Sequence, residues 1–380
     1  MKNKRKGFLL WGYYGFGNLG DDLMLKVITK KILNKYPDSK ILARCYDEPE
    51  EKNVIPFPIE KNETSCRVLK TLVYFMRLFK AISRTDYFVL GGGAYFLDKG
   101  RHSLSLLFLA IAVLFARVMR KKVYIIGIGM DILTFPLNLV YLKYILRKST
   151  CACLRDNYSF TTASYLVKKD NIYRTSDILF DESFVASLTQ DIVSRNKYII
   201  VSLTDYYHTH PSSEKRQLMM NKSSDLIRML INKYSDKYRI LLCAFQKTYG
   251  ERDYEFLTEI QNALFEDHKD YADKIDLNYI RTEDQIREFF SSAVCVIGMR
   301  YHSLVLASLF KKPFIGIDIE MKIREFCGEF TMPFIGIHEF CEKGISSTEI
   351  EGLLRNNVSD QTIQDHIKKS RENFEWLNEL

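Results

Sequence analysis

Two side chains that could bind and protonate a small anion, Arg300 and His302, lie two positions apart in the sequence. An apolar run at 293–298 precedes them and is typical of a buried strand, and 304–309 is typical of a helix. We therefore expect both side chains where a strand ends and a helix begins. Open α/β sheets bind ligands at that edge, and helix amino ends favour anions. The guanidinium suits a carboxylate or phosphate, and the imidazole suits proton transfer near neutral pH. The alternative is structural: an ion pair and a helix cap.

A second candidate site follows the first apolar run, 7–12. Gly15, Gly17 and Gly20 form a GxGxxG pattern before a helix expected at 22–35. This pattern alone is a weak indication of dinucleotide binding, and Asp21 and Asp22 would repel a pyrophosphate. The two carboxylates could instead hydrogen-bond sugar hydroxyls, act as a base, or cap the helix.

Other predicted strands also end in residues that suit a ligand site. Three glycines, 91–93, follow the strand expected at 87–90, and a backbone without side chains lets a ligand or a neighbouring loop approach closely. Arg155 and Asp156 follow 151–154, while Glu320 and Lys322 follow 313–318.

Composition limits the function classes without choosing among them. The chain has 380 residues, of which 47% are hydrophobic, so two domains with ample cores are expected. A formal net charge of +8 suits an anionic ligand, a membrane surface or nucleic acid equally well. The eight cysteines are scattered without a CxxC pair, which favours reduced core thiols over disulfides or a metal site.

Two further segments lie outside these motifs. The apolar stretch 104–118 is shorter than the roughly 20 residues of a membrane-spanning helix, so we favour a buried helix. A helix that rests on a membrane surface beside basic residues is the alternative. The stretch 56–63, with Pro56 and Pro58, is interpreted as a polar linker.

Strands and helices alternate in two successive runs, which predicts an α/β protein with two Rossmann-like domains facing each other across a cleft. The expected domains are 1–190 and 191–360, followed by a C-terminal helix at 361–380.

Taken together, the motifs resemble those of the polysaccharide pyruvyl transferases. That family combines a GYxGxxNxGD loop, a GGG turn, an RD pair and a GMRxH(S/A)L block followed by an acid-x-lysine. Here the block has Tyr301 where leucine is usual, Glu320 replaces the usual aspartate, and Thr204 and Asp205 stand where an arginine is common. The matching positions are Gly12 to Asp21, Gly91 to Gly93, Arg155 with Asp156, Gly298 to Leu304, and Glu320 with Lys322.

The resemblance implies a GT-B-like fold and transfer of pyruvate from phosphoenolpyruvate to a sugar, as a cyclic ketal in exopolysaccharide biosynthesis. It implies no metal and no cofactor, since phosphoenolpyruvate is a co-substrate. His302, Arg300 and Asp21 would be catalytic, with the acceptor on the domain 1–190 and the donor on the domain 191–360. The residues expected to bind the donor are Arg300, Arg155, Lys322, Glu320 and Ser303, and those expected to bind the acceptor are Gly15, Gly17, Asn18, Gly20, Asp21, Gly91, Gly92 and Gly93.

The expected partners are phosphoenolpyruvate and a sugar or lipid-linked oligosaccharide, not nucleic acid. A cytoplasmic location is expected, with peripheral contact at the inner membrane face left open. A glycosyltransferase that uses a nucleotide sugar, and a catalytically silent sugar-binding protein, remain the alternative functions.

Overall fold

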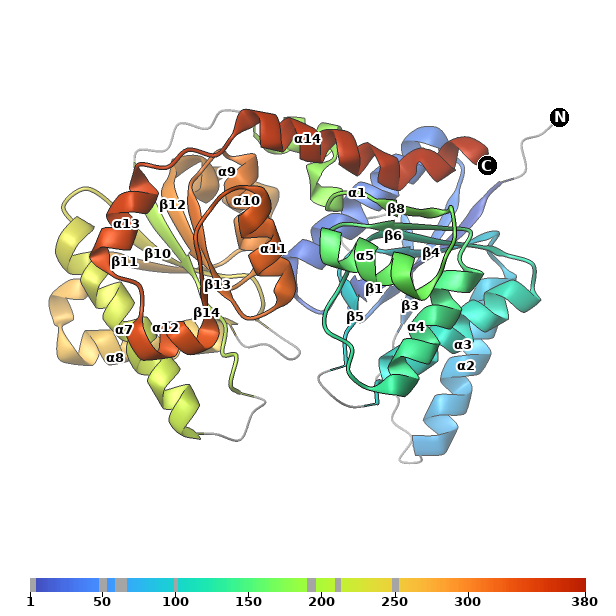
Figure 1. Ribbon diagram of the computed structural model, residues 1–380, viewed down its shortest axis with the longest axis horizontal. Helices are drawn as coiled ribbons and strands as arrows, with labels where there is room; N and C mark the ends of the chain where they lie inside the picture. Colours follow the sequence, from blue (N-terminus) through green and yellow to red (C-terminus); the bar gives the residue numbers. More distant parts are fainter. Residues whose placement is uncertain are drawn as a thin grey trace. The chain divides into compact units, whose positions relative to one another are not determined.

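The computed structural model describes residues 5–47, 53–58, 67–98, 102–189, 196–208, 213–247 and 253–380. The chain forms two compact units, each with a parallel sheet and its own helices (Figure 1). Unit 1 comprises Met1–Asp181 and His366–Leu380, and unit 2 comprises Glu182–Asp365. This confirms the predicted α/β class with two Rossmann-like units.

The sheet of unit 1 runs in the order β3-β2-β1-β4-β6-β7-β8, with the short β5 paired to β6. Its central strand β1 has the sequence GFLLWGYY and is almost entirely buried, as expected for a parallel strand covered on both faces. The strands are β1 (Gly7–Tyr14), β2 (Lys40–Cys45), β3 (Val54–Pro58), β4 (Tyr87–Gly91), β5 (Ala94–Phe96), β6 (Lys122–Met130), β7 (Cys151–Leu154) and β8 (Ile172–Arg174). The helices are α1 (Leu19–Lys35), α2 (Arg67–Ser83), α3 (Leu104–Val118), α4 (Pro136–Lys148), α5 (Asn157–Leu166) and the 3₁₀ turn η1 (Ile178–Phe180).

The sheet of unit 2 runs in the order β11-β10-β9-β12-β13-β14. Its strands are β9 (Tyr198–Ser202), β10 (Arg239–Ala244), β11 (Ile275–Tyr279), β12 (Ala293–Gly298), β13 (Phe314–Asp318) and β14 (Phe334–Gly336). Its helices are α6 (Glu182–Leu188), α7 (Ser213–Tyr234), α8 (Asp253–Asp267), η2 (Lys269–Tyr271), α9 (Glu283–Ser292), α10 (Tyr301–Leu309), α11 (Met321–Glu329), α12 (Ile337–Lys343) and α13 (Ser347–Leu354). The chain then continues into α14 (Asp360–Arg371) and the 3₁₀ segment η3 (Glu372–Glu379).

Each sheet contains a point where the strand order reverses direction. In unit 1 this point lies between β1 and β4, and in unit 2 it lies between β9 and β12. Ligands of open parallel sheets bind outside the carboxyl ends of the strands at such a switch point. The expected acceptor-binding glycines of unit 1 and the Arg300–His302 pair of unit 2 therefore lie at the carboxyl ends of strands, where this fold holds ligands.

The interpretation of 56–63 as a linker was wrong for its first residues. Pro56 and Pro58 belong to β3, which pairs with β2 at the edge of the sheet. Proline lacks an N–H donor, and an edge strand tolerates that loss because its outer side needs no partner. Residues 59–63 lie outside the described part of the chain.

The boundaries of the units differ from those expected at 190 and 360. Unit 2 already begins at Glu182, since α6 packs against α9. The terminal segment is α14 followed by η3, and it returns to the sheet of unit 1 from His366 onward. There Trp376 stacks on Tyr124 with ring centroids 4.2 Å apart. The C-terminal residues are thus part of the core of unit 1.

Candidate functional site

Arg300 lies where β12 ends and α10 begins, and it is the N-cap residue of that helix. The backbone N–H of Met299 donates to Ser202 O at 2.8 Å, which fixes this turn beside the end of β9. The guanidinium donates from Nε to Asp253 Oδ2 at 2.9 Å and from Nη2 to Gln246 Oε1 at 3.3 Å, and Nη2 also donates to Asp253 Oδ1. The arginine is therefore held in one orientation.

Asp253, which orients Arg300, is fully buried at the start of α8. Its Oδ2 also accepts the backbone N–H groups of Phe245 and Gln246 at 3.2 and 3.1 Å. Burial raises the pKa of the Asp253 carboxyl, and hydrogen bonds from Thr204 and these two backbone groups act in the opposite direction. No local pattern marks Asp253 as part of a site, because its partner Arg300 lies 47 positions away along the chain.

His302 lies in the first turn of α10 with 9% of its surface exposed. The ring of Tyr301 meets it edge-on at 5.2 Å and also contacts Phe326, so the unusual tyrosine of the block packs inside unit 2. Ser303 is fully buried, and its Oγ donates to Arg300 O at 2.6 Å. The serine expected to bind the donor thus stabilises the turn that carries Arg300 and His302.

Lys322 and Glu320 lie at the start of α11, beyond the end of β13, and form an ion pair with each other. Their side chains are 18% and 26% exposed, so a ligand can reach both. Because β12 and β13 are neighbours in the sheet, Lys322 belongs to the same sheet edge as Arg300 and His302.

A cation also reaches the end of β9, where the family often has an arginine. Arg216, from α7, donates to Asp205 Oδ2 at 2.6 Å and to Glu259 at 2.7 Å. Arg216 thus brings a guanidinium to this strand end from a different element, and the two carboxylates neutralise its charge.

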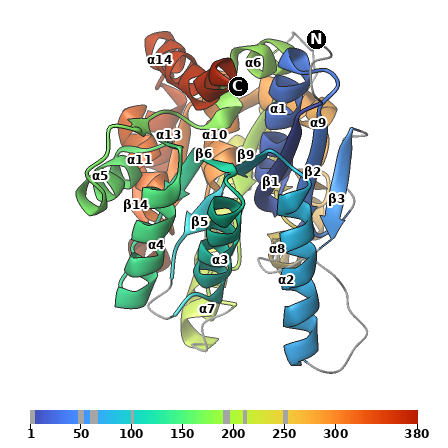
Figure 2. The same ribbon diagram turned by 90° about the vertical axis from the view of Figure 1, so that its right-hand side faces the viewer.

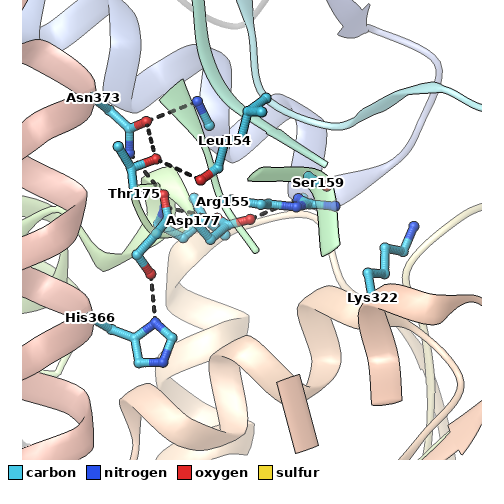
Figure 3. A network of polar contacts seen from close by, with 12 residues as sticks. Leu154, Arg155, Ser159, Thr175, Asp177, Lys322, His366 and Asn373 are labelled. Carbon is cyan, nitrogen blue, oxygen red and sulfur yellow. Dashed lines mark hydrogen bonds and ion pairs between the residues drawn. The ribbon is translucent and has the colours of Figure 1, made fainter. Parts of the chain in front are cut away.

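Arg155 lies in unit 1, directly after the end of β7. Its Nη1 donates to Asp177 Oδ2 at 2.8 Å, and both side chains are 1% exposed (Figure 3). A Cβ at Gly129 would come within 2.8 Å of Arg155 Nε. A guanidinium so enclosed and paired supports the fold of unit 1, and its expected contact with the donor stays a prediction.

The two glycine segments of unit 1 meet at Asp21. Gly93 has φ +85°, and a Cβ there would lie 2.8 Å from Asp21 Oδ1. Gly15 N donates to Asp22 Oδ1 at 2.7 Å, while the Asn18 side chain accepts from Gly20 N at 3.2 Å and caps α1. The structure therefore brings together the residues expected to bind the acceptor.

Aromatic side chains outside the expected acceptor-binding set lie in this loop and beside it. Tyr13 and Phe16 stack with ring centroids 4.0 Å apart and an interplanar angle of 9°, and Tyr46 contacts Phe16. Arg44 lies over the Trp11 ring at 4.8 Å and donates to Gly12 O at 3.3 Å. Tyr13 and Phe16 could have been recognised in the sequence as candidate binding residues, because aromatic rings often line ligand sites.

Among the described residues, no group of three or more His, Cys, Asp or Glu side chains is placed to hold a metal ion. The seven cysteines in this part of the chain are free, and all but Cys151 are buried.

A family model described as polysaccharide pyruvyl transferase matches residues 18–320, a span that includes Asp21, Gly91 to Gly93, Arg300 and His302. The chain belongs to the polysaccharide pyruvyl transferase family. No curated protein sequence matches it.

Solved structures similar to this pyruvyl transferase family member include UDP-GlcNAc 2-epimerases. The UDP-GlcNAc 2-epimerase of Methanocaldococcus jannaschii superposes with TM-score 0.63 at 13% identity, covering 99% of this chain and 100% of that one. A putative UDP-N-acetylglucosamine 2-epimerase of Listeria monocytogenes gives 0.62 at 13% identity, covering 96% and 91%. Anabaena HepE, solved with UDP and glucose, gives 0.57 at 14% identity, covering 99% and 100%. At these identities the likeness shows the fold alone, and it confirms the predicted GT-B-like class.

Proposed function

We propose that this protein transfers the pyruvyl group of phosphoenolpyruvate to two hydroxyls of one sugar, forming a cyclic ketal during cell-surface polysaccharide synthesis. Membership of the pyruvyl transferase family supports this reaction class. The observation that carries the proposal is the arrangement at the switch point of unit 2. There the buried carboxylate of Asp253 orients Arg300, and His302 follows two positions later in the sequence.

On the donor side, phosphoenolpyruvate presents a carboxylate and a phosphate. Arg300 and Lys322, at the ends of neighbouring strands, are the cations that we assign to these groups. Lys322 is paired with Glu320, so donor binding would exchange a carboxylate partner for a phosphate or carboxylate of the ligand. Asp253 would keep the Arg300 fork oriented while the ligand binds.

In the proposed reaction, His302 gives a proton to the methylene carbon of phosphoenolpyruvate. The central carbon then becomes electrophilic, and a sugar hydroxyl forms the first C–O bond to it. The bond between this carbon and the phosphate oxygen breaks, phosphate leaves, and a second hydroxyl closes the ring. Two protons leave the hydroxyls; one restores His302 and the other departs with phosphate or solvent.

On the acceptor side, we assign sugar binding to the edge formed by Asp21 and the glycine segments. Asp21 lies against Gly93, where only a glycine leaves room beside the carboxylate. A carboxylate accepts hydrogen bonds from neighbouring sugar hydroxyls, and the stacked Tyr13 and Phe16 offer a flat apolar surface. Asp21 would also accept the hydroxyl proton that does not return to His302 and pass it to phosphate or solvent.

The test is incubation with phosphoenolpyruvate and a panel of sugars or lipid-linked oligosaccharides. We expect phosphate release together with a gain of about 70 dalton on one acceptor, the mass of a pyruvyl ketal. His302→Ala should abolish turnover while the melting temperature stays near that of the wild type. His268→Ala, at an exposed histidine of the same unit, is the matched control and should retain activity.

Two results would overturn the proposal. Stabilisation by uridine diphosphate but not by phosphoenolpyruvate would favour the nucleotide-sugar transferase. Full pyruvylation by His302→Ala would remove the histidine from the chemistry.

A further inference from the structure

The outer helices of unit 1 expose several large apolar side chains. Figure 2 shows α4, α3 and α2 side by side, and neighbouring helices of this set are in contact. Rings of α2 and α3 interlock between them: Phe75 meets Phe108 at 5.3 Å, and Phe79 meets Phe115 at 5.5 Å. We call these three helices the outer helical layer. Its exposed apolar residues are Leu72, Met76 and Phe79 of α2, Leu104, Leu114 and Val118 of α3, and Leu137 and Val140 of α4.

The side of α3 that faces away from the sheet is apolar along its whole length. Positions 104, 107, 108, 111, 114, 115 and 118 recur at helical spacing, each is at least partly exposed, and each is Leu, Phe, Ile or Val. A surface helix of a globular protein normally has polar residues there. On α2 the exposed residues Leu72, Met76 and Phe79 also lie on one face, at spacings of four and three.

Charge on the same layer has one sign. The sequences of α2, α3, α4 and the adjoining α5 contain no aspartate or glutamate. Exposed basic residues gather where these helices end, namely Lys80, Arg84, Arg117, Arg120, Arg147, Lys148, Lys168 and Lys169. Partial burial lowers the pKa of Lys169, and the nearby charges of Arg117 and Lys148 lower it further.

A cavity of about 540 Å³ lies within this basic cluster. Lys143, Arg147, Lys168 and Lys169 line it, with Tyr165, Leu166 and Val167 completing the wall. Its lining contains no acidic residue, and Tyr165 is 86% exposed at its edge. Such a site suits a phosphate group attached to an apolar body.

We propose that the outer helical layer is a membrane-docking surface that rests on an anionic lipid bilayer, with its apolar side chains in the interface and the basic cluster against lipid phosphates. Of the described helices, none is both long and apolar enough to cross a bilayer. Contact with a membrane surface does not require a spanning helix, because an apolar face next to basic residues partitions into the headgroup region of anionic membranes. A protein partner would explain the apolar patch, and nucleic acid would explain the charge. A bilayer of anionic lipid explains both.

The test is co-sedimentation of the full-length protein with vesicles, without substrate, so that its outcome is independent of the proposed reaction. We expect binding to phosphatidylcholine vesicles that contain phosphatidylglycerol, weaker binding to phosphatidylcholine alone, and partial release by salt. The double variant Leu114→Ser/Val118→Ser should reduce partitioning roughly tenfold. Leu218→Ser is its control, because Leu218 of unit 2 has the same 44% exposure as Leu114.

The charge is tested by Arg147→Glu/Lys168→Glu, which should weaken binding to anionic vesicles by at least about fivefold for each reversed residue. Lys237→Glu, on an exposed turn of unit 2, is the control and should bind as the wild type does. Melting temperatures of all variants check that each is folded. Three results would each overturn the proposal: no vesicle binding, equal binding by the variants and their controls, or retention by double-stranded DNA without vesicle binding.

Discussion

The behaviour of Arg300 depends on one buried carboxylate. Asp253 holds the guanidinium through two donor atoms, so the arginine has a defined orientation before any ligand arrives. A bidentate pair of this kind is specific to the planar guanidinium and cannot be reproduced by a single ammonium group. Both the stability of this edge and its use of an anionic donor should therefore be sensitive to the identity of the residue.

Replacing Arg300 with lysine should impair both properties. One ammonium cannot satisfy both Asp253 oxygens and Gln246, so we expect a loss of about 1–3 kcal/mol in the free energy of unfolding. We also expect a raised KM for phosphoenolpyruvate. Denaturant titration and steady-state kinetics measure the two effects. Arg324→Lys, in the more exposed pair with Asp318, is the control and should change stability by less than about 1 kcal/mol. Unchanged KM and kcat in Arg300→Lys would contradict the assignment.

At Gly93 a single methyl group should be harmful. Its φ of +85° is strained for any other residue, and the added Cβ would lie 2.8 Å from Asp21 Oδ1. We expect Gly93→Ala to lower the free energy of unfolding by about 1–3 kcal/mol and to weaken acceptor use. Gly352→Ala is the control, because a Cβ there meets nothing within 4 Å and the residue is helical. Equal stability of the two variants would show that the Gly93 backbone relaxes easily.

At the scale of elements, the start of α1 shows how local structure organises a site. The helix begins at Leu19, three residues earlier than expected, since Asn18 rather than Asp21 or Asp22 is its cap. The two carboxylates lie in the first turn, where the helix dipole stabilises them. This places Asp21 against Gly93 and leaves Asp22 to receive the Gly15 N–H.

Removing the cap should therefore affect both helix and loop. We expect Asn18→Ala to cost about 1 kcal/mol in the free energy of unfolding, and Asn18→Ser to retain most of that stability. Hydrogen exchange of the amides of Gly15, Gly17 and Gly20 should accelerate in the alanine variant. If exchange stays at the wild-type rate, the loop is held by the Asp22 contact instead.

For the whole molecule, the C-terminal segment joins the far end of the chain to unit 1. Asn373 Oδ1 accepts from Gly127 N at 2.9 Å and from the Thr175 hydroxyl at 2.9 Å, and its Nδ2 donates to Ser176 O at 2.8 Å (Figure 3). Nearby, Ser176 Oγ and His366 Nδ1 lie 2.6 Å apart. One buried asparagine thus satisfies a backbone N–H inside β6 and a backbone carbonyl just beyond β8.

Loss of this side chain should destabilise unit 1 as a whole. Asn373→Ala would leave several buried donors and acceptors without partners, so we expect a loss of about 2–4 kcal/mol in the free energy of unfolding. Asn356→Ala, at an exposed asparagine, is the control and should stay within about 0.5 kcal/mol of the wild type. Thermal or urea unfolding measures both variants. A small loss in Asn373→Ala would mean that water replaces the amide.

Buried thiols should also limit stability in alkali. Burial raises the pKa of Cys45, Cys295 and Cys327 each to about 12. Unfolded thiols ionise near pH 8.5, so the unfolded state loses protons first and stability falls as the pH rises from about 8.5 to 12. Each such thiol contributes up to about 1.4 kcal/mol per pH unit in that window. In Cys295→Ala, the free energy of unfolding should fall less steeply with pH in this window. An unchanged slope would contradict the raised pKa of the Cys295 thiol.

Much of the architecture could be predicted because its signals are local. Apolar runs such as 7–12 and 293–298 correspond to β1 and β12, and 104–118 matches α3 residue for residue. Elements without a clear signal were missed, among them α4, β5 and the set from α11 to α13. Short strands and helices depend on the neighbours that cover them, so their local sequence carries little information.

The candidate site divides in the same way. Residue type and position along the chain determined that Arg300, His302, Asp21 and the glycines lie at strand and helix ends. Such ends can be predicted because strand length and helix capping depend on only a few neighbouring residues. Pairing across dozens of positions was decided by the fold. It set Asp253 against Arg300, enclosed Arg155 with Asp177, and brought Gly93 to Asp21. Contacts of this kind arise when the crossovers of a parallel sheet bring distant strand ends together, and no local pattern encodes which ends will meet.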